Sequence, residues 1–193
     1  MNETIDRKKL TRYTEAEIDQ LIKRELYKIN SWNNKRRLEY ISKRKVLRKF
    51  QNQNIYSNGV FLLDNFFVAK KLHNNMNGYV FWKNEINSLK RVIGNHHFPQ
   101  LIAADPNNLI IYMTYCGKTI ENIGRSPQNW RQQVNNIKRV LVNKQLNPND
   151  ILPRNVCCLN GVIKLIDFGL SNVRYSEIIS SIKKLHQLML TYS

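Results

Sequence analysis

Two oxygen-bearing side chains are expected to meet at one end of a β-hairpin near the end of the sequence. Asn160-Gly161 is a strong hairpin turn signal, and it separates two apolar runs. In an antiparallel hairpin the start of the first strand lies beside the end of the second, which places Asn155 next to Ile166 and Asp167. An amide oxygen and a carboxylate suit Mg²⁺, which takes one or two protein ligands and completes its shell with phosphate and water.

A further carboxylate precedes this pair. Asp150 lies five residues before Asn155, in a loop stiffened by Pro148 and Pro153. A carboxylate held there can accept the proton of an attacking hydroxyl group. These residue types suit a metal-assisted reaction of a hydroxyl with a phosphate; the alternative interpretation is structural, because Asn and Asp commonly flank strands.

The order and spacing of these residues resemble the protein-kinase superfamily. Residues 150–155 resemble the kinase catalytic loop, in which four residues separate Asp from Asn. Residues 163–171 contain Asp-Phe-Gly, which is similar to the kinase metal-binding motif and stands at close to its usual distance from the loop. The resemblance implies that Asp150 is the catalytic base and that Asn155 and Asp167 are the metal ligands.

An ATP-binding lysine is implied by a second resemblance. Residues 67–72 resemble the kinase strand that carries this lysine, and matching their apolar residues selects Lys70, with Lys71 as the alternative. Glu85 shares an expected helix face with apolar residues, so its side chain should point inward. Because a buried carboxylate is costly unless it is paired, we expect a Lys70–Glu85 pair that holds the ATP phosphates.

The segment between the two expected lobes resembles the kinase hinge. It spans residues 110–117. The resemblance implies that backbone groups of Thr114, Tyr115 and Cys116 meet the adenine edge, with Met113 at the back of the pocket. An ordinary buried strand is the alternative interpretation.

The sequence departs from the kinase pattern at several places. It has no glycine-rich loop before the lysine strand, only Ser57-Asn58-Gly59. Pro148-Asn149 replaces the His-Arg before the catalytic Asp, and Leu152 replaces a lysine of Ser/Thr kinases. The part after Gly169 is short and leads to one helix, which resembles the central helix of the large lobe. Small viral kinases, RIO-type kinases and kinases of tRNA-modification complexes share such brevity.

The expected fold class is α+β, a two-lobed kinase-like fold with a five-stranded antiparallel N-lobe and a truncated helical C-lobe. The N-lobe should span about residues 51–115 and the C-lobe about 117–193. Between the strands of the N-lobe a helix is expected over residues 80–93, ending at Gly94. In the C-lobe, Ser126 and Pro127 predict the start of a long helix. Residues 176–190 should form the last helix.

Residues 1–50 are expected to form a basic helical extension outside the kinase-like domain. Thr14 and Glu17 make a capping box, followed by apolar residues at helical spacing. The second basic stretch, residues 43–49, is interpreted as a solvated helix face, and a contact with an anionic partner or a targeting patch are the alternative interpretations.

The charge balance points to anionic partners. Lys and Arg number 31 against 14 acidic residues, a net charge of +17, so expected partners are ATP, an acidic protein or nucleic acid. The three cysteines lack metal-site spacing, and no apolar run approaches the ~20 residues that span a bilayer. With a polar N-terminus and no expected signal peptide, we predict an intracellular protein, in the cytoplasm or nucleus, or in the host cell if it is viral.

These observations lead to an ATP- and Mg²⁺-dependent phosphotransferase, an atypical Ser/Thr protein kinase, as the main functional hypothesis. A pseudokinase that binds nucleotide or acts as a scaffold is one alternative, and the missing glycine loop favours it. A small-molecule kinase is another, because aminoglycoside and sugar phosphotransferases share the Asp…Asn loop. A basic nucleic-acid-binding protein with coincidental motifs is the remaining alternative.

Overall fold

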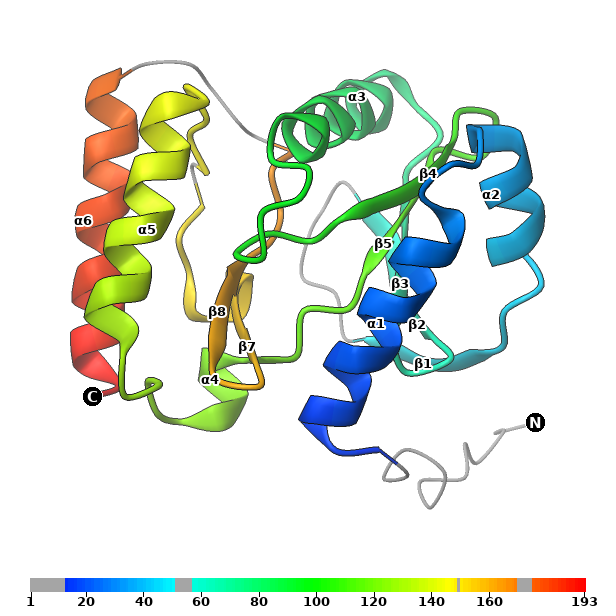
Figure 1. Cartoon of the computed structure of the whole chain (residues 1–193). Helices are drawn as coiled ribbons and strands as arrows, with labels where there is room; N and C mark the ends of the chain where they lie inside the picture. Colours follow the sequence, from blue (N-terminus) through cyan, green and yellow to red (C-terminus); the bar gives the residue numbers. More distant parts are fainter. Residues whose placement is uncertain (1–12, 51–56, 149, 170–174) are drawn as a thin grey trace, which may run out of the picture. The chain divides into compact units, whose positions relative to one another are not determined.

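The computed structural model describes residues 13–50, 57–148, 150–169 and 175–193 (Figure 1). These residues form an α+β fold with a five-stranded antiparallel sheet, a three-stranded sheet and six α-helices. The chain divides into two compact units. The first unit contains Met1–Trp82 and Leu101–Tyr115, and the second contains Lys83–Gln100 and Cys116–Ser193.

The first unit is built on the five-stranded sheet. Its strands are β1 (Val46–Phe50), β2 (Ser57–Leu63), β3 (Phe67–Leu72), β4 (Leu101–Asp105) and β5 (Ile110–Thr114). They lie in the order β1-β2-β3-β5-β4, and every neighbouring pair is antiparallel. A turn at Asp64-Asn65 joins β2 to β3, with positive φ angles of 48° and 67° that Asp and Asn tolerate better than most residues.

Two helices precede the sheet, α1 (Glu15–Ile29) and α2 (Asn34–Ile41). The predicted capping box at Thr14 is present and starts α1. The Asn34 side chain both donates to and accepts from the backbone of Ala104 in β4. Arg37 donates to the carbonyls of Ile29 and Asn30, at 3.2 and 2.8 Å, and so satisfies the C-terminal end of α1.

The prediction that residues up to 50 are helical is wrong for Val46–Phe50, which form strand β1. These residues are extended because β1 pairs with β2. A segment this short adopts the helical or the extended state according to its pairing partner, which the segment's own sequence does not reveal. Residues 1–12, part of the same predicted extension, lie outside the described residues, as do residues 51–56 before β2.

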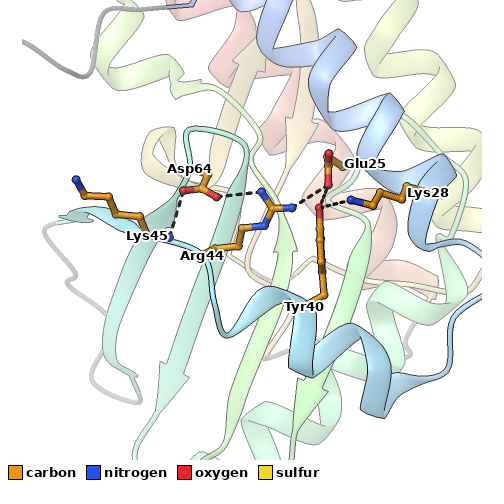
Figure 2. A network of polar contacts seen from close by, with 6 residues as sticks. All are labelled: Glu25, Lys28, Tyr40, Arg44, Lys45 and Asp64. Carbon is orange, nitrogen blue, oxygen red and sulfur yellow. Dashed lines mark hydrogen bonds and ion pairs between the residues drawn. The ribbon is translucent and has the colours of Figure 1, made fainter.

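Arg44 links α1, α2 and the β2–β3 turn (Figure 2). Its guanidinium lies 3.1 Å from a carboxylate oxygen of Glu25 in α1 and 3.1 Å from one of Asp64 in the turn. The same group lies over the Tyr40 ring of α2, 4.1 Å from the centroid. Tyr40 donates a hydrogen bond to Glu25, so this buried carboxylate has two partners. A buried charge with both partners in place avoids the desolvation cost of an unpaired one.

The second unit contains most of the remaining helices. Helix α3 (Met76–Arg91) begins four residues earlier than predicted, and its chain passes from the first unit into the second after Trp82. Gly94 follows α3 with φ of 80°, a conformation that favours glycine. The other elements are α4 (Ile120–Ile123), α5 (Trp130–Asn143), α6 (Tyr175–Thr191), a 3₁₀ turn (Pro153–Asn155), β6 (Lys118–Thr119), β7 (Val156–Leu159) and β8 (Val162–Leu165).

Helices α5 and α6 lie side by side within this unit (Figure 1). Helix α5 has a buried apolar stripe, namely Trp130, Val134, Ile137 and Leu141. The prediction that Ser126 caps this helix is wrong, because α5 begins at Trp130 after Asn129. Ser126 instead bonds the end of α6: its hydroxyl donates to the Met189 carbonyl at 2.7 Å.

Candidate functional site

The β7–β8 hairpin positions the candidate metal ligands. Its turn is Asn160-Gly161, with φ angles of 50° and 74°, as the sequence predicted. At the open end the backbone N–H of Ile166 donates to the Asn155 carbonyl at 3.1 Å. Asn155 therefore lies across the hairpin from the residue that immediately precedes Asp167, which confirms the predicted register.

Asn155 also fixes the loop that carries Asp150. Its amide nitrogen donates to the Asp150 carbonyl at 3.0 Å and to the Asp150 carboxylate at 3.1 Å. Arg154 lies 3.8 Å from the same carboxylate. Asn155 is buried, whereas the Asp150 side chain is 38% exposed. A buried amide thus holds an accessible carboxylate in one orientation.

Asn147 anchors the start of this loop, although it was not among the site residues predicted from the sequence. Its side chain is fully buried. Its amide oxygen accepts a hydrogen bond from the Ser181 hydroxyl at 2.8 Å, and its amide nitrogen donates to the Glu177 carboxylate at 3.3 Å. Both partners belong to α6, so this helix fixes the position at which the Asp150 loop begins.

Gln133 of α5 holds the hairpin, and it too was missed. Its amide nitrogen donates to the Gly161 carbonyl at 2.8 Å, and its amide oxygen accepts from the Ile163 N–H at 2.8 Å. The signal was available in the sequence, because Gln133 follows Trp130 by three residues and precedes Ile137 by four, within the apolar stripe. A polar residue on a buried face needs hydrogen-bond partners, which predicts such a bond.

His97, on the segment after α3, holds the other edge of β8. Its Nδ1 lies 2.9 Å from the Ile163 carbonyl, and its own carbonyl accepts from the Leu165 N–H at 2.9 Å. Since a carbonyl can only accept, Nδ1 carries the proton. Burial lowers the pKa of this imidazole, so the ring is neutral near pH 7.

The Asp-Phe-Gly segment follows β8 after one residue, Ile166. Asp167 has a φ of 67°, which is uncommon outside glycine and persists only where neighbours hold the backbone. Two such neighbours are present: Phe168 is fully buried against Phe98, and the Gly169 carbonyl accepts from the Asn84 side chain at 3.3 Å. The fixed backbone limits the directions in which the Asp167 carboxylate can point.

The two groups of the predicted phosphate-holding pair are both buried. Lys70 in β3 is 6% exposed and Glu85 in α3 is 1% exposed, whereas Lys71 is exposed. The burial of Glu85 is what its place on the helix face predicted. Lys70 belongs to the first unit and Glu85 to the second, so their pairing stays a prediction.

The predicted hinge lies at the end of β5, where the chain passes from the first unit to the second between Tyr115 and Cys116. Met113 and Thr114 are buried in β5. The Tyr115 N–H donates to the Phe66 carbonyl at 2.9 Å, so this one backbone group already has a partner within the protein. Contact of residues 114–116 with adenine stays a prediction.

The three cysteines are free thiols buried in the second unit. Burial raises the pKa of Cys116 to about 12 and that of Cys157 well above its usual value. Both thiols are therefore protonated and weakly nucleophilic at neutral pH.

Among the residues that the structure describes, no group of three or more His, Cys, Asp and Glu side chains is arranged to hold a metal ion. In the same part of the chain, no helix combines the length and apolar character needed to cross a bilayer. No protein-family model matches the sequence, and no curated protein matches it either.

Proposed function

We propose that this protein is an ATP- and Mg²⁺-dependent phosphotransferase of the protein-kinase type, which transfers phosphate to a Ser or Thr hydroxyl of a protein. One observation carries the proposal. Asn155 bonds the carboxylate and the carbonyl of Asp150 while its own carbonyl bonds the residue before Asp167. A single buried residue thus connects the proposed base with the proposed metal ligand.

The donor set fits a magnesium ion bound with phosphate. The amide nitrogen of Asn155 is used by Asp150, so its amide oxygen is the atom proposed as a metal ligand, together with the Asp167 carboxylate. Mg²⁺ prefers oxygen ligands and takes few from the protein when a nucleotide supplies the others. Bound Mg-ATP would supply the phosphoryl group and the positive charge that stabilises its transfer.

Asp150 is proposed to accept the proton of the substrate hydroxyl. Its side chain is accessible, and the bonds from Asn155 hold its orientation without burying it. A base must be within hydrogen-bond reach of the proton it removes, so an exposed and oriented carboxylate suits this role. Leu152 stands where Ser/Thr kinases have a lysine, so that positive charge is missing from the loop. Arg154, which lies beside Asp150, supplies a positive charge in the same loop.

The buried ionisable groups support the rest of the kinase assignment. A buried lysine and a buried glutamate are each costly unless paired, and Lys70 and Glu85 are the pair that a kinase-like site requires. The burial of Lys70 and the exposure of Lys71 favour Lys70 as the phosphate contact. The antiparallel sheet of the first unit fits the proposed N-lobe, and the helices of the second fit the proposed short C-lobe.

The proposal is tested by separating nucleotide binding from phosphate transfer. Wild-type protein should gain thermal stability with millimolar Mg-ATP, and Asp167→Ala should lose most of that gain, because a ligand of the folded state stabilises it. Asp150→Asn should retain the gain but reduce phosphate incorporation from labelled ATP by about 100-fold or more, as for loss of a general base. Glu121→Gln, an exposed carboxylate of the same unit, is the matched control and should change neither.

Two results would contradict parts of this proposal. No thermal shift of the wild type in Mg-ATP would remove the nucleotide site. A thermal shift without phosphate transfer to the protein itself or to a panel of basic and acidic proteins would favour the pseudokinase alternative, in which the altered loop at Pro148 and Leu152 has lost catalysis.

A further inference from the structure

The end of α1 exposes an aromatic ring among cations. Tyr27 is 88% exposed, so almost none of its ring is covered by the protein. Lys23 and Arg24 precede it by four and three residues and are its neighbours on the helix surface. Lys28 follows Arg24 by four residues, and all three cations are exposed. The ring therefore lies in a cationic environment and is open to solvent.

Helix α2 extends this surface through contacts between cations and rings. The Lys28 ammonium lies 4.7 Å from the centroid of the Tyr40 ring, which meets the Trp32 ring edge-on at 5.3 Å. The Arg36 guanidinium lies over Trp32 at 4.3 Å. Arg24, Tyr27, Lys28, Trp32 and Arg36 are hereafter called the α1–α2 corner.

The acidic residues that the structure describes nearby form no ion pair with the cations of the corner, including Glu39, which is exposed three residues after Arg36 on α2. Glu25 is buried and engaged by Arg44 and Tyr40 (Figure 2). Asp19 pairs with Lys23 at 2.7 Å, so Lys23 is not counted as part of the corner. In the part of the chain that the structure describes, Arg24, Lys28 and Arg36 form no ion pair, and they are the cations available to an anion.

We propose that the α1–α2 corner binds single-stranded nucleic acid, with its three cations on the phosphates and a base stacked on Tyr27. Base stacking on an exposed ring requires bases that are not already stacked in a duplex, which favours a single strand. The net charge of +17 attracts polyanions of any kind to the protein. The exposed Tyr27 ring favours a polyanion that also carries bases, because phosphate groups do not stack on a ring. This proposal is independent of phosphate transfer, because no residue of the corner is among those proposed to bind ATP or Mg²⁺ or to act as the base.

The stacking part is tested with fluorescein-labelled 20-nucleotide oligouridylate and the full chain, by fluorescence anisotropy. Tyr27→Ala should weaken binding by about fivefold or more, the usual effect of losing one stacked base. Tyr27→Phe keeps the ring and should bind like the wild type. Both variants should keep the thermal midpoint, because the side chain is exposed. Equal affinity of Tyr27→Ala and wild type would overturn the proposed stacking.

The phosphate part is tested by salt dependence. The double variant Arg24→Gln/Arg36→Gln should reduce the slope of log affinity against log salt by about 1.4, or about 0.7 for each phosphate that is no longer neutralised. Lys183→Gln/Lys184→Gln makes the same charge change on exposed residues of α6 and should leave the slope unchanged.

Three outcomes would overturn the proposal as a whole. The first is an equal loss of slope in both double variants, which would show that only net charge matters. The second is binding of a 20-base-pair duplex as tight as that of the single strand. The third is binding to phosphatidylserine vesicles without binding to oligouridylate, which would make the corner a membrane-facing surface.

Discussion

Replacement of Gln133 by Met should destabilise the second unit through one buried hydrogen-bond site. The Gln133 amide accepts from the Ile163 N–H and donates to the carbonyl of Gly161 and the side chain of Asn129, at 2.8, 2.8 and 2.6 Å. Met has nearly the same length and helix propensity, so the change removes polar groups and little else.

The magnitude follows from what each partner can do after the change. Gly161 and Asn129 are exposed, so water can replace Gln133 at both. Ile163 is fully buried, and its N–H would have no partner, which costs about 1–3 kcal/mol. We expect the free energy of unfolding to fall by about 2 kcal/mol, which for a chain of this size corresponds to a decrease in Tm of about 4–8 °C.

Urea unfolding followed by tryptophan fluorescence measures this change, because Trp130 is buried in the same helix one turn away. Gln132→Met is the matched control: its side chain is exposed on α5, and it should alter the free energy of unfolding by less than about 0.5 kcal/mol. If Gln133→Met is as stable as Gln132→Met, the hairpin does not depend on this amide and the reasoning is wrong.

Three other predictions concern the second unit. Burial lowers the pKa of His97 in the folded protein, so below about pH 6.5 the unfolded state binds more protons at this residue than the folded state does. The free energy of unfolding should therefore be unaffected by this group above that pH and should decrease as the pH falls below it. Urea unfolding at a series of pH values measures this decrease, which should be smaller in His97→Asn. Gly117→Ala should be strongly destabilising in thermal unfolding, because an added Cβ would lie 2.0 Å from the Cys158 carbonyl oxygen and φ is 89°. Cys116, with its pKa raised to about 12, should react with a thiol reagent at pH 7.5 only after denaturant is added, and rapid reaction of the native protein would contradict its burial.

The parts of the fold that local sequence determines were predictable. The turn residues Asn160-Gly161 specify the hairpin by their own backbone preferences, and the register then follows, which placed Asn155 beside Ile166. The capping box at Thr14 is equally local. These features need no knowledge of distant residues.

The features that failed or were missed depend on distant partners. Ser126 has the residue type and the following proline of an N-cap, but its hydroxyl bonds the last turn of α6, far along the chain. Strand β1 forms because β2 is available to pair with it, which the basic stretch itself does not reveal. The anchors of the candidate site, Asn147 and His97, bond residues 34 and 66 positions away, and no local pattern specifies those partners.

The division of the chain into units has a consequence for biosynthesis. Residues Lys83–Gln100 belong to the second unit but lie between the two parts of the first. During translation, the last strands of the first unit are synthesised only after this insert. The insert in turn lacks its packing partners until the residues after Tyr115 have been synthesised. Neither unit corresponds to a continuous fragment, so no single truncation isolates one complete unit. Contacts between segments far apart in the sequence slow folding, and segments whose partners are not yet synthesised expose apolar surface that favours aggregation.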